Sequence, residues 1–473
     1  MKLQWPKASL IRSLSSLVFL GGLGMNLALA QAGNASHPSA SPPCRVQPAD
    51  YKGWQAQQIS NRWVQLTVVP QNGGRLMQVV FAGHPYLFVN PKYEGKYLPP
   101  SPGEWFNYGG DKIWLLPEGN DDEQHWAGGS DAIDDSPFAF RKVSEGQQCE
   151  IELTGAPDPR TGVQFVRTIR LQSDSPRIHF RANMKNITGH SLEWSMQSVS
   201  QYDTGAPSPP RTGAPSGINH DFRTFTPANP SSSYLNRYHV RFGPAENRAA
   251  SIRDDGLFTL HYVHMAAELW LDSTAGWLAV VDGMSRYGMV ERFQYEESRT
   301  YPGKASIIFW TNGTAVKLSP DGVASMPPED DSSPYYLEAE VNSPLCRLRP
   351  GESCNLDTEW FPTRVGSEFH GVTDAGLVAS PLRASLLAGG KVKLSGSFGV
   401  FFAGRLVAHF YDEHGQGLGS LPVADADPVE LVALETEIAP PGKPGRVSLH
   451  LEDSSGLDRG SLGEVRVEQG EVH

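Results

Sequence analysis

Residues 62–89 read RWVQLTVVPQNGGRLMQVVFAGHPYLFV, and this stretch decides the fold class. Apolar and polar side chains alternate along residues 62–69, as they do in a half-buried strand. The cluster PQNGG at residues 70–74 is a turn signal, and the segment that follows it is again strand-like. A second turn at residues 83–85 leads into the apolar residues 86–89. Short strands joined by tight turns predict an antiparallel sheet.

The same spacing of strand-like runs and turns continues to about residue 365. We expect further neighbouring strands, at residues 148–154 with 163–171, at 177–186 with 192–202, and at 257–264 with 268–271 and 277–282. Amphipathic helical stretches do not exceed about two turns. We therefore predict an all-β chain with two antiparallel sheets packed face to face.

A second unit is predicted over residues 366–473. Its alternating segments lie at residues 391–401, 406–411, 431–438 and 446–451. About 100 residues with this spacing suit a small immunoglobulin-like β-sandwich. Its polar residues are scattered, so we expect a packing or spacer domain.

The first 30 residues are predicted to be a signal peptide. Three basic residues (Lys2, Lys7 and Arg12) precede the apolar residues 14–27, and Ala-Leu-Ala at 28–30 matches a cleavage site. The apolar run is shorter than the roughly 20 residues of a transmembrane helix and contains three glycines. An uncleaved anchor is the alternative. We expect secretion, with the bacterial periplasm as the destination, and no membrane insertion after signal cleavage.

The composition supports a folded, exported chain. The 473 residues carry a formal charge of -12, and removal of the signal leaves 37 basic against 52 acidic residues, a net charge of -15. Nucleic-acid binding rests on a basic surface, so no nucleic-acid partner is expected. Residues 31–43 (QAGNASHPSASPP) are small, polar and rich in proline, which predicts a disordered linker. The first folded domain is therefore expected over residues 44–365.

All four cysteines follow the predicted signal peptide, in a chain expected to reach an oxidising compartment. Cys346 and Cys354 flank a turn, and they would face each other if Gly351 is the left-handed residue of a three-residue hairpin loop. We predict a Cys346–Cys354 disulfide and, by exclusion, Cys44–Cys149. A metal site is the alternative, but no CxxC pair or neighbouring histidine supports it. We predict no metal and no cofactor.

Residues 104–138 are the candidate ligand-binding stretch: EWFNYGGDKIWLLPEGNDDEQHWAGGSDAIDDSPF. Aromatic rings beside carboxylates and amides suit a sugar, whose ring faces are apolar and whose rim carries hydroxyl groups. The alternative is a long surface loop held by its own aromatic side chains. The acidic residues at 121–123 and 131–135 lack the spacing of a calcium-binding loop, so we expect a solvated acidic surface there. The predicted substrate-binding residues of this stretch are Trp105, Asn107, Asp111, Lys112, Trp114 and Trp126.

Five motifs in order resemble a known family. They are NGGRL at 72–76, GHPYL at 83–87, NYGGD at 107–111, NIT at 186–188 before a strand, and YLEAE at 336–340 before LRPGES at 348–353. This order is similar to galactose-mutarotase-like (aldose 1-epimerase-like) proteins, in a branch of unknown function, over about residues 44–362. The resemblance implies a large antiparallel β-supersandwich for the first domain and a mono- or oligosaccharide ligand.

The resemblance also implies site residues. Glu338 matches the family's general base, and Arg75 matches an arginine near the sugar. A mutarotase also needs a general acid for the ring oxygen, usually a histidine in the strand after the Asn-x-Thr motif. Residues 194–201 contain no histidine, so His125 is the candidate substitute.

Alternation along residues 336–340 puts Glu338 and Glu340 on one face of a strand. On a concave face each would raise the pKa of the other. A sugar groove further predicts that Arg75, Trp105, Asp111, His125 and Glu338 converge on one concave face.

Three functions follow from these observations. The first is an exported carbohydrate-binding protein that keeps the mutarotase-like groove and lacks standard epimerase activity. The second is an aldose 1-epimerase-like isomerase or related carbohydrate enzyme that uses Glu338 as base. The third is a structural interaction module of the cell envelope. The oligomeric state and the identity of the sugar do not follow from the sequence.

Overall fold

The computed structural model describes residues 42–101, 104–119, 122–129, 131–206, 217–314, 317–318, 324–325 and 334–469. The predicted signal peptide lies outside these residues, as do Asp121 and nearly all of the predicted linker. Within the described residues the chain is built from β-strands and three short 3-10 helices, which confirms the all-β prediction. Those helices are η1 (Pro91–Tyr93), η2 (Pro302–Lys304) and η3 (Ala388–Gly390).

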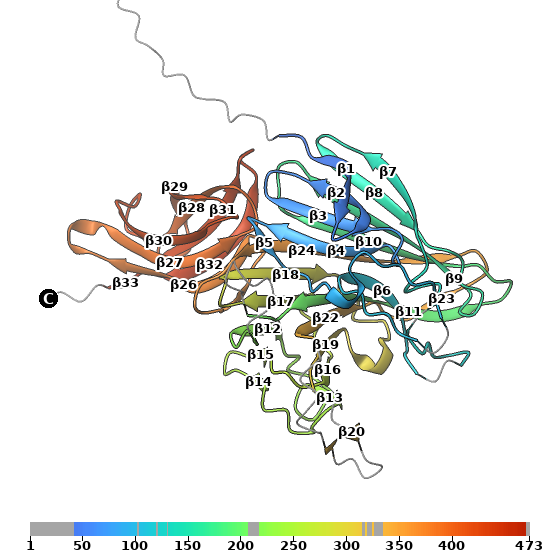
Figure 1. Ribbon diagram of the computed structural model, residues 1–473. Helices are drawn as coiled ribbons and strands as arrows, with labels where there is room; N and C mark the ends of the chain where they lie inside the picture. The colour runs from blue at the N-terminus through green and yellow to red at the C-terminus, as the bar shows by residue number, and fades with distance from the viewer. Residues whose placement is uncertain are drawn as a thin grey trace, which may run out of the picture. The chain divides into compact units, whose positions relative to one another are not determined.

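Two large antiparallel sheets form the first part of the chain (Figure 1). The order across the twelve-stranded sheet is β1 (Arg45–Tyr51), β2 (Trp54–Ser60), β3 (Val64–Val69), β4 (Arg75–Phe81), β6 (Asp111–Leu116), β11 (Leu192–Asp203), β22 (Tyr336–Asn342), β19 (Ile307–Thr311), β16 (Ala267–Leu271) and β13 (His239–Phe242), with β5 (His84–Pro85) beside β4 and β23 (Cys346–Leu348) beside β11. The order across the ten-stranded sheet is β14 (Ala250–Ile252), β15 (Leu257–His261), β12 (Phe222–Pro227), β17 (Trp277–Asp282), β18 (Tyr287–Phe293), β24 (Ser353–Arg364), β10 (Ile178–Asn186), β9 (Val163–Gln172), β8 (Gln148–Thr154) and β7 (Ala139–Ser144). A separate two-stranded antiparallel sheet consists of β20 (Lys317–Leu318) and β21 (Ala324–Ser325).

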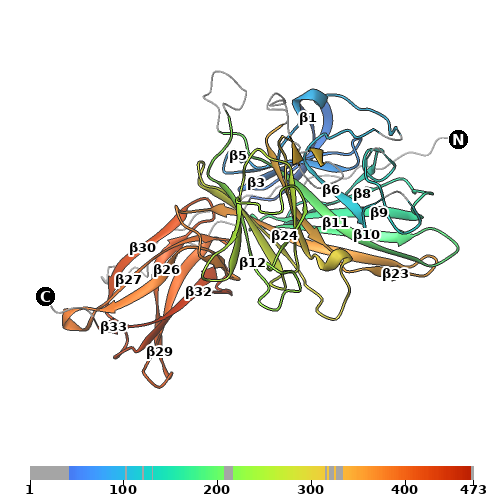
Figure 2. The ribbon, with the colours of Figure 1, turned by 90° about the horizontal axis from the view of Figure 1, so that it is seen from below.

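The C-terminal strands form two smaller sheets, drawn in orange to red in Figures 1 and 2. One contains β25 (Gly371–Val372), β26 (Gly376–Leu386), β27 (Val392–Val400), β30 (Leu431–Ile438) and β33 (Glu468–Gln469). The other contains β29 (Gly417–Ala426), β28 (Gly404–Tyr411), β31 (Arg446–Asp453) and β32 (Asp458–Arg466). The sequence predicted β27, β28, β30 and β31. It did not predict β26, β29 and β32, because proline, glycine or charged residues interrupt the alternation of apolar residues in these three strands.

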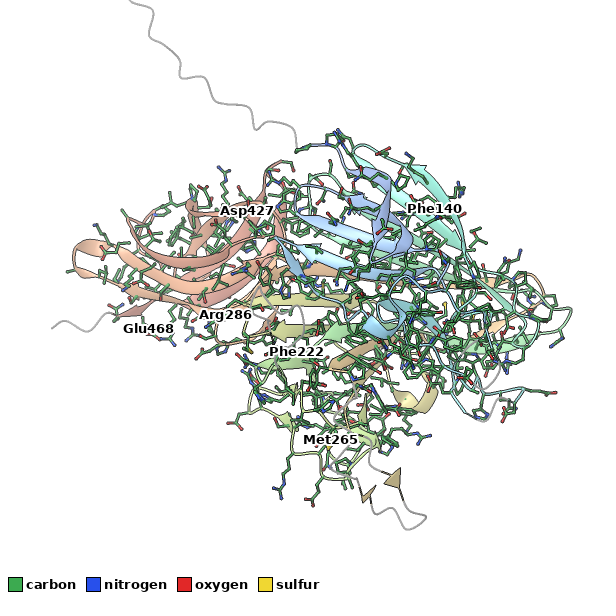
Figure 3. All side chains as sticks on the ribbon, in the orientation of Figure 1. Phe140, Phe222, Met265, Arg286, Asp427 and Glu468 are labelled. Carbon is green, nitrogen blue, oxygen red and sulfur yellow. A yellow bond between two sulfur atoms is a disulfide. The ribbon has the colours of Figure 1, made fainter. Side chains whose placement is uncertain are left out.

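The main core lies between the two large sheets, where strand alternation points one side of each strand inward (Figure 3). On β22 the inward residues are Leu337, Ala339 and Val341, all fully buried. A second apolar cluster contains residues of β17, β18 and β24, among them Val281 of β17 and Phe361 of β24. These residues pack with apolar residues of the C-terminal strands. The C-terminal strands therefore share a buried apolar cluster with the ten-stranded sheet.

Two predicted sets of neighbouring strands are wrong. The segment at 257–264 becomes β15, which pairs with β12 and β14, whereas β16 lies in the other large sheet and β17 pairs with β12 and β18. The segments at 177–186 and 192–202 become β10 and β11, but β10 pairs with β9 and β24, whereas β11 pairs with β6 and β22. The chain crosses from one sheet to the other at the turn after Asn186. That side chain donates to the carbonyl of His190 at 2.7 Å and to that of Leu348 at 3.0 Å, which holds the crossover in place.

Both predicted disulfides are present, with Cα–Cα distances of 5.8 Å for Cys44–Cys149 and 6.5 Å for Cys346–Cys354. Gly351 has the predicted left-handed conformation, with φ of 78°. The two cysteines beside it do not lie in a two-stranded hairpin, however. Cys346 belongs to β23, which pairs with β11, and Cys354 belongs to β24 of the ten-stranded sheet. The Cys346–Cys354 bond therefore ties the two large sheets together. Within the described residues no helix is long and apolar enough to cross a membrane.

Candidate functional site

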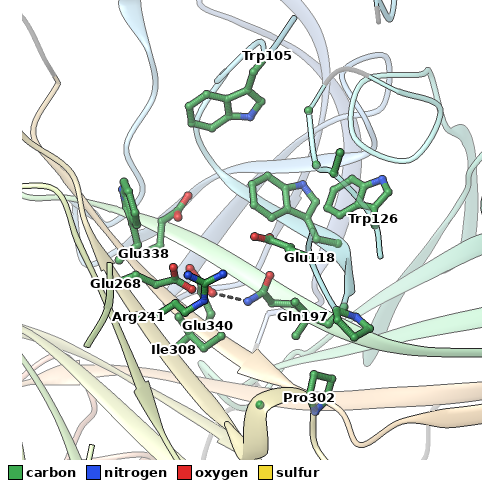
Figure 4. A pocket seen from close by; sticks show the side chains of 18 of the residues that line it. Trp105, Glu118, Trp126, Gln197, Arg241, Glu268, Pro302, Ile308, Glu338 and Glu340 are labelled. Atoms are coloured by element: carbon green, nitrogen blue, oxygen red, sulfur yellow. Dashed lines mark hydrogen bonds between the residues drawn. The ribbon is translucent and has the colours of Figure 1, made fainter. Parts of the chain in front are cut away.

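A cavity of about 840 Å³ lies against the twelve-stranded sheet, on the side that faces away from the main core. Side chains from six neighbouring strands and from the loops beside them line it (Figure 4). The lining includes several carboxylates, an amide and a group of aromatic rings. Among its lining residues are Trp105, Trp114, Glu118, Trp126, Gln197, Arg241, Glu268, Trp270, Ile308, Trp310, Tyr336, Glu338 and Glu340.

Strand register brings these side chains together. On β22, Glu338 and Glu340 occupy the positions that alternate with the inward core residues. Glu338 is paired with Trp310 of β19, and Trp310 is in turn paired with Glu268 of β16. Gln197 of β11 is paired with Trp114 of β6. Because side chains directly opposite each other on adjacent strands lie close together, these registers place acids and rings on one surface.

The loops before and after β6 form one wall of the cavity. Trp126 is fully buried, and its indole N–H donates to Asp131 Oδ2 at 2.6 Å. Its backbone N–H donates to the carbonyl of Pro117 at 2.9 Å, and its carbonyl accepts from Gly119 at 2.9 Å. These bonds hold the neighbouring Glu118 against the cavity, while the indole of Trp105 is 45% exposed. Figure 4 shows Trp105 and Pro302 at opposite ends of the group of lining residues, with Glu118 between them.

Hydrogen bonds from β11 orient the two glutamates of β22. Gln201 Nε2 donates to Glu338 Oε1 at 2.6 Å, and Gln197 Nε2 donates to Glu340 Oε2. Lys112 Nζ lies 3.7 Å from Glu338 Oε1 and 3.8 Å from the centre of the Trp114 ring. The glutamate carboxylates are therefore fixed in position, and one cation lies beneath them.

The carboxylates differ in how readily they ionise. Burial raises the pKa of Glu340 well above its usual range, and the charges of Glu338 and Glu268 raise it further. Enclosure by protein atoms raises the pKa of Glu118 to about 7, although its side chain stays accessible to solvent. Burial also raises the pKa of Glu268 and lowers that of the Lys112 ammonium. The environment of the cavity therefore favours the protonated form of several of its carboxyl groups.

One buried polar atom of the cavity lacks a partner. Gln197 is 2% exposed, and its Oε1 accepts no hydrogen bond within the described residues. Buried polar atoms are normally satisfied, because leaving one unpaired costs about 1–3 kcal/mol. A bound hydroxyl or ammonium group would supply the missing donor.

Of the predicted site residues, Trp105, Trp114, Trp126 and Glu338 line the cavity. Lys112 is 1% exposed and lies behind the lining, in contact with Glu338 and Trp114. The candidate ligand-binding stretch at residues 104–138 thus contributes its three tryptophans to the cavity, and the motif at 336–340 contributes its glutamates.

Three predicted residues are buried away from the cavity. Arg75 Nη2 donates to Asp134 Oδ1 at 2.7 Å, so its guanidinium is paired inside the protein. Asp111 forms a buried ion pair with Arg167. Asn107 Oδ1 accepts from the backbone N–H of Gly109 at 3.2 Å and shapes the loop. The predicted convergence of Arg75 and Asp111 on the concave face is therefore wrong.

His125 is also separate from the cavity. Its Nδ1 lies 2.7 Å from Asp122 Oδ1 on the same exposed loop, and it is absent from the lining. Among the described residues that line the cavity there is no histidine. Burial raises the pKa of four of its carboxyl groups, those of Glu118, Asp131, Glu268 and Glu340.

The acidic run at 131–135 is not the solvated surface that the sequence predicted. Asp134 and Asp135 are buried, and both lie against Arg75. Asp134 Oδ1 also accepts from the indole N–H of Trp114 at 2.9 Å, which links this buried ion pair to the cavity wall. Across the described residues no group of three or more potential ligands is arranged to hold a metal ion.

Sequence reasoning missed Gln197, Arg241, Glu268, Trp270 and Trp310, together with Glu118 as a cavity residue. Glu268, Trp270 and Trp310 interrupt apolar strands with large or charged side chains at alternate positions. Such a pattern indicates that this side of the strand does not face the apolar core. The register that joins β16, β19 and β22 spans more than 70 residues of sequence, and no local pattern specifies it.

No protein-family model matches the sequence, and a search of curated proteins finds no match. Among solved structures, a putative mutarotase from Salmonella typhimurium is similar at 10% identity and a TM-score of 0.44, over 67% of this chain and 94% of that protein. A galactose mutarotase-like protein from Clostridium acetobutylicum matches at 10% identity and a TM-score of 0.40, over 68% of this chain and 99% of that protein. A TPR-domain containing protein from Parabacteroides distasonis matches at 15% identity and a TM-score of 0.43, over 70% of this chain, which spans about half (54%) of that protein. The chain is thus similar in fold, at low identity, to galactose-mutarotase-like proteins over about two thirds of its length.

Proposed function

We propose that the cavity over β22 binds a saccharide. The observation that carries this proposal is the composition of its lining, in which aromatic rings alternate with fixed carboxylates and one amide. Rings such as Trp105 and Trp310 offer flat apolar surfaces to the C–H faces of a sugar. Glu338, Glu340 and Gln197 offer hydrogen-bonding groups to its hydroxyls. A volume of about 840 Å³ lies within the range of small-molecule sites and accommodates more than one sugar ring.

The chain is proposed to bind this saccharide outside the cytoplasm. The two disulfides support that location, because such bonds persist in oxidising compartments. The periplasm, the signal peptide at residues 1–30 and a separate C-terminal domain over residues 366–473 remain part of the proposal.

A second candidate function is opening and reclosing of the sugar ring. This reaction needs a base at the anomeric hydroxyl and an acid at the ring oxygen. Glu338 and Glu340 both line the cavity, and burial raises the pKa of Glu340, which favours its protonated form. A carboxyl group with a raised pKa next to a second carboxyl group can supply an acid and a base without a histidine.

A ligand screen combined with anomeric-exchange NMR separates the candidates. Free sugars and oligosaccharides would be tested against the wild type and Glu338→Gln, which keeps the shape of the side chain and its bond from Gln201. Binding without exchange establishes a binding protein. Exchange above background that disappears in Glu338→Gln establishes an isomerase. No binding by any saccharide would contradict both candidates and leave a structural envelope module.

A further inference from the structure

We infer that the saccharide bound by this cavity carries an unacylated, positively charged amine. The inference rests on the proposed saccharide binding and names the class of sugar. It starts from the charge of the lining, which contains six carboxylates against two guanidinium groups. The described residues hold no cluster of metal ligands that would neutralise these acids instead.

Four of the carboxylates are close enough to influence one another's ionisation. The charges of Glu268 and Glu338 act on Glu118, and those of Glu338, Glu268 and Glu118 act on Glu340. Three protein cations face this group. Lys112 lies under Glu338, Arg160 belongs to the lining, and Arg241 lines the cavity beside Glu268 (Figure 4). The guanidinium of Arg241 also lies 5.9 Å from the Trp270 ring. Because these acids raise one another's pKa, a bound cation would relieve their mutual repulsion, and a neutral sugar would not.

The aromatic rings favour the same class of ligand. A cation within about 6 Å of an aromatic face is attracted by the ring quadrupole. Trp105, Trp114, Trp270, Trp310 and Tyr336 all border the cavity near the carboxylates. Acids and ring faces together favour a ligand that carries an ammonium group.

Gln197 provides the second, independent observation. Its Oε1 is a buried acceptor without a donor among the described residues, at the border of the cavity and next to Glu340. An ammonium group has three donors and no acceptor. It can donate to Gln197 Oε1 and still contact the neighbouring carboxylates. An acetylated amine has one N–H and no charge, so it cannot do both.

Three tetrasaccharides with the same β-1,4-linked glucose backbone test the inference. They differ only in the group at carbon 2, which is an ammonium in the glucosamine tetramer, an acetamide in tetra-N-acetylchitotetraose and a hydroxyl in cellotetraose. Each would be titrated calorimetrically into the full chain at pH 6. We expect the glucosamine tetramer to bind at least about tenfold more tightly than the other two, and to lose affinity as salt rises.

Glu268→Gln and Glu338→Gln are the test variants, and the exposed Glu413→Gln is the matched control. We expect each cavity variant to reduce the affinity for the glucosamine tetramer by about tenfold and to leave the affinity for tetra-N-acetylchitotetraose nearly unchanged. Circular dichroism and thermal unfolding of each variant would show that the fold is kept. Glu118→Gln, on the accessible loop, serves if either strand variant fails to fold.

The other outcomes overturn the inference in distinguishable ways. Equal affinity for the three tetramers would overturn it and leave saccharide binding intact. Binding of spermidine as tight as that of the glucosamine tetramer would show a site for cations in general. Unchanged affinity for the glucosamine tetramer in all cavity variants would show that its amine does not bind beside Glu118, Glu268 or Glu338. If none of the three binds and the wider saccharide screen is also negative, the proposed function fails as well.

Discussion

Glu338 and Glu340 stand two residues apart on β22, and both carboxyl groups enter the same cavity. Gln201 orients the first and Gln197 the second. Burial, together with the charge of Glu338, raises the pKa of Glu340 well above its usual range. These two glutamates lie at the centre of the proposed site. The aromatic rings around them offer the flat apolar surfaces on which we propose that a saccharide stacks.

Trp105→Ala is expected to weaken saccharide binding by about tenfold, or about 1.4 kcal/mol. The ring is 45% exposed at the border of the cavity, so its removal takes away a stacking surface and leaves the core intact. Calorimetric titration would measure the affinity, and Leu457→Ala, 54% exposed, is the control. A loss of affinity of the same size in Leu457→Ala would contradict a specific role for the Trp105 ring.

Arg75→Met is expected to destabilise the protein by about 3–5 kcal/mol, because it leaves Asp134 as an unpaired buried charge. The exposed pair of Arg141 and Glu152 has a similar distance of 2.8 Å, and Arg141→Met should cost less than about 1 kcal/mol. Urea unfolding of both variants would measure the difference. Equal stability of the two would show that Arg75 does not serve as the buried support described above.

Glu291→Gln is expected to make stability less dependent on pH. Burial raises the pKa of Glu291 to about 8, while the Tyr202 hydroxyl donates to it at 2.5 Å. A carboxyl whose pKa is higher in the folded state than in the unfolded state binds more protons when folded. The free energy of unfolding therefore falls as pH rises from about 4.5 to 8, by on the order of 1 kcal/mol per pH unit for a fully buried group.

Thermal unfolding at several pH values would compare Glu291→Gln with the wild type and with the exposed Glu413→Gln. The Glu291→Gln substitution should flatten the decline between about pH 5 and 8, and the control should follow the wild type. Parallel curves for all three proteins would show that Glu291 ionises normally.

Removal of the Cys44–Cys149 bond should cost more stability than removal of Cys346–Cys354. The first closes a loop of 105 residues and the second a loop of 8, so the entropic estimates are about 4.7 and about 2.5 kcal/mol. Urea unfolding of the two double serine variants would give the order. A larger loss for the short loop would mean that joining β23 to β24 matters more than chain entropy.

Local patterns were sufficient for much of the fold. Residues 64–69 and 75–81 are strands as predicted, because alternation and the PQNGG turn are local signals. The pairing of β10 and β11 was wrong because two adjacent strands can join either of two sheets, and only tertiary packing selects between them. The disulfides followed from cysteine count and turn chemistry, although the structural role of Cys346–Cys354 did not.

The candidate site was only partly predictable. Glu338 and Glu340 share a face because strand alternation requires it, and Trp105, Trp114 and Trp126 stood out by composition. The partners of these residues come from strands distant in sequence, so Glu268 and Trp310 were missed. Asp111 and Arg75 looked like ligand-binding groups because their buried ion-pair partners, Arg167 and Asp134, could not be identified from the sequence.

The most direct test of saccharide binding at β22 is saturation-transfer NMR with a mixture of mono- and oligosaccharides, including the three tetramers above. It would be recorded on the wild type and on the Glu338→Gln, Glu340→Gln double variant. The proposed site predicts saturation transfer to at least one saccharide on the wild type and its loss in a folded double variant. Absence of transfer to every saccharide, or equal transfer in both proteins, would contradict it.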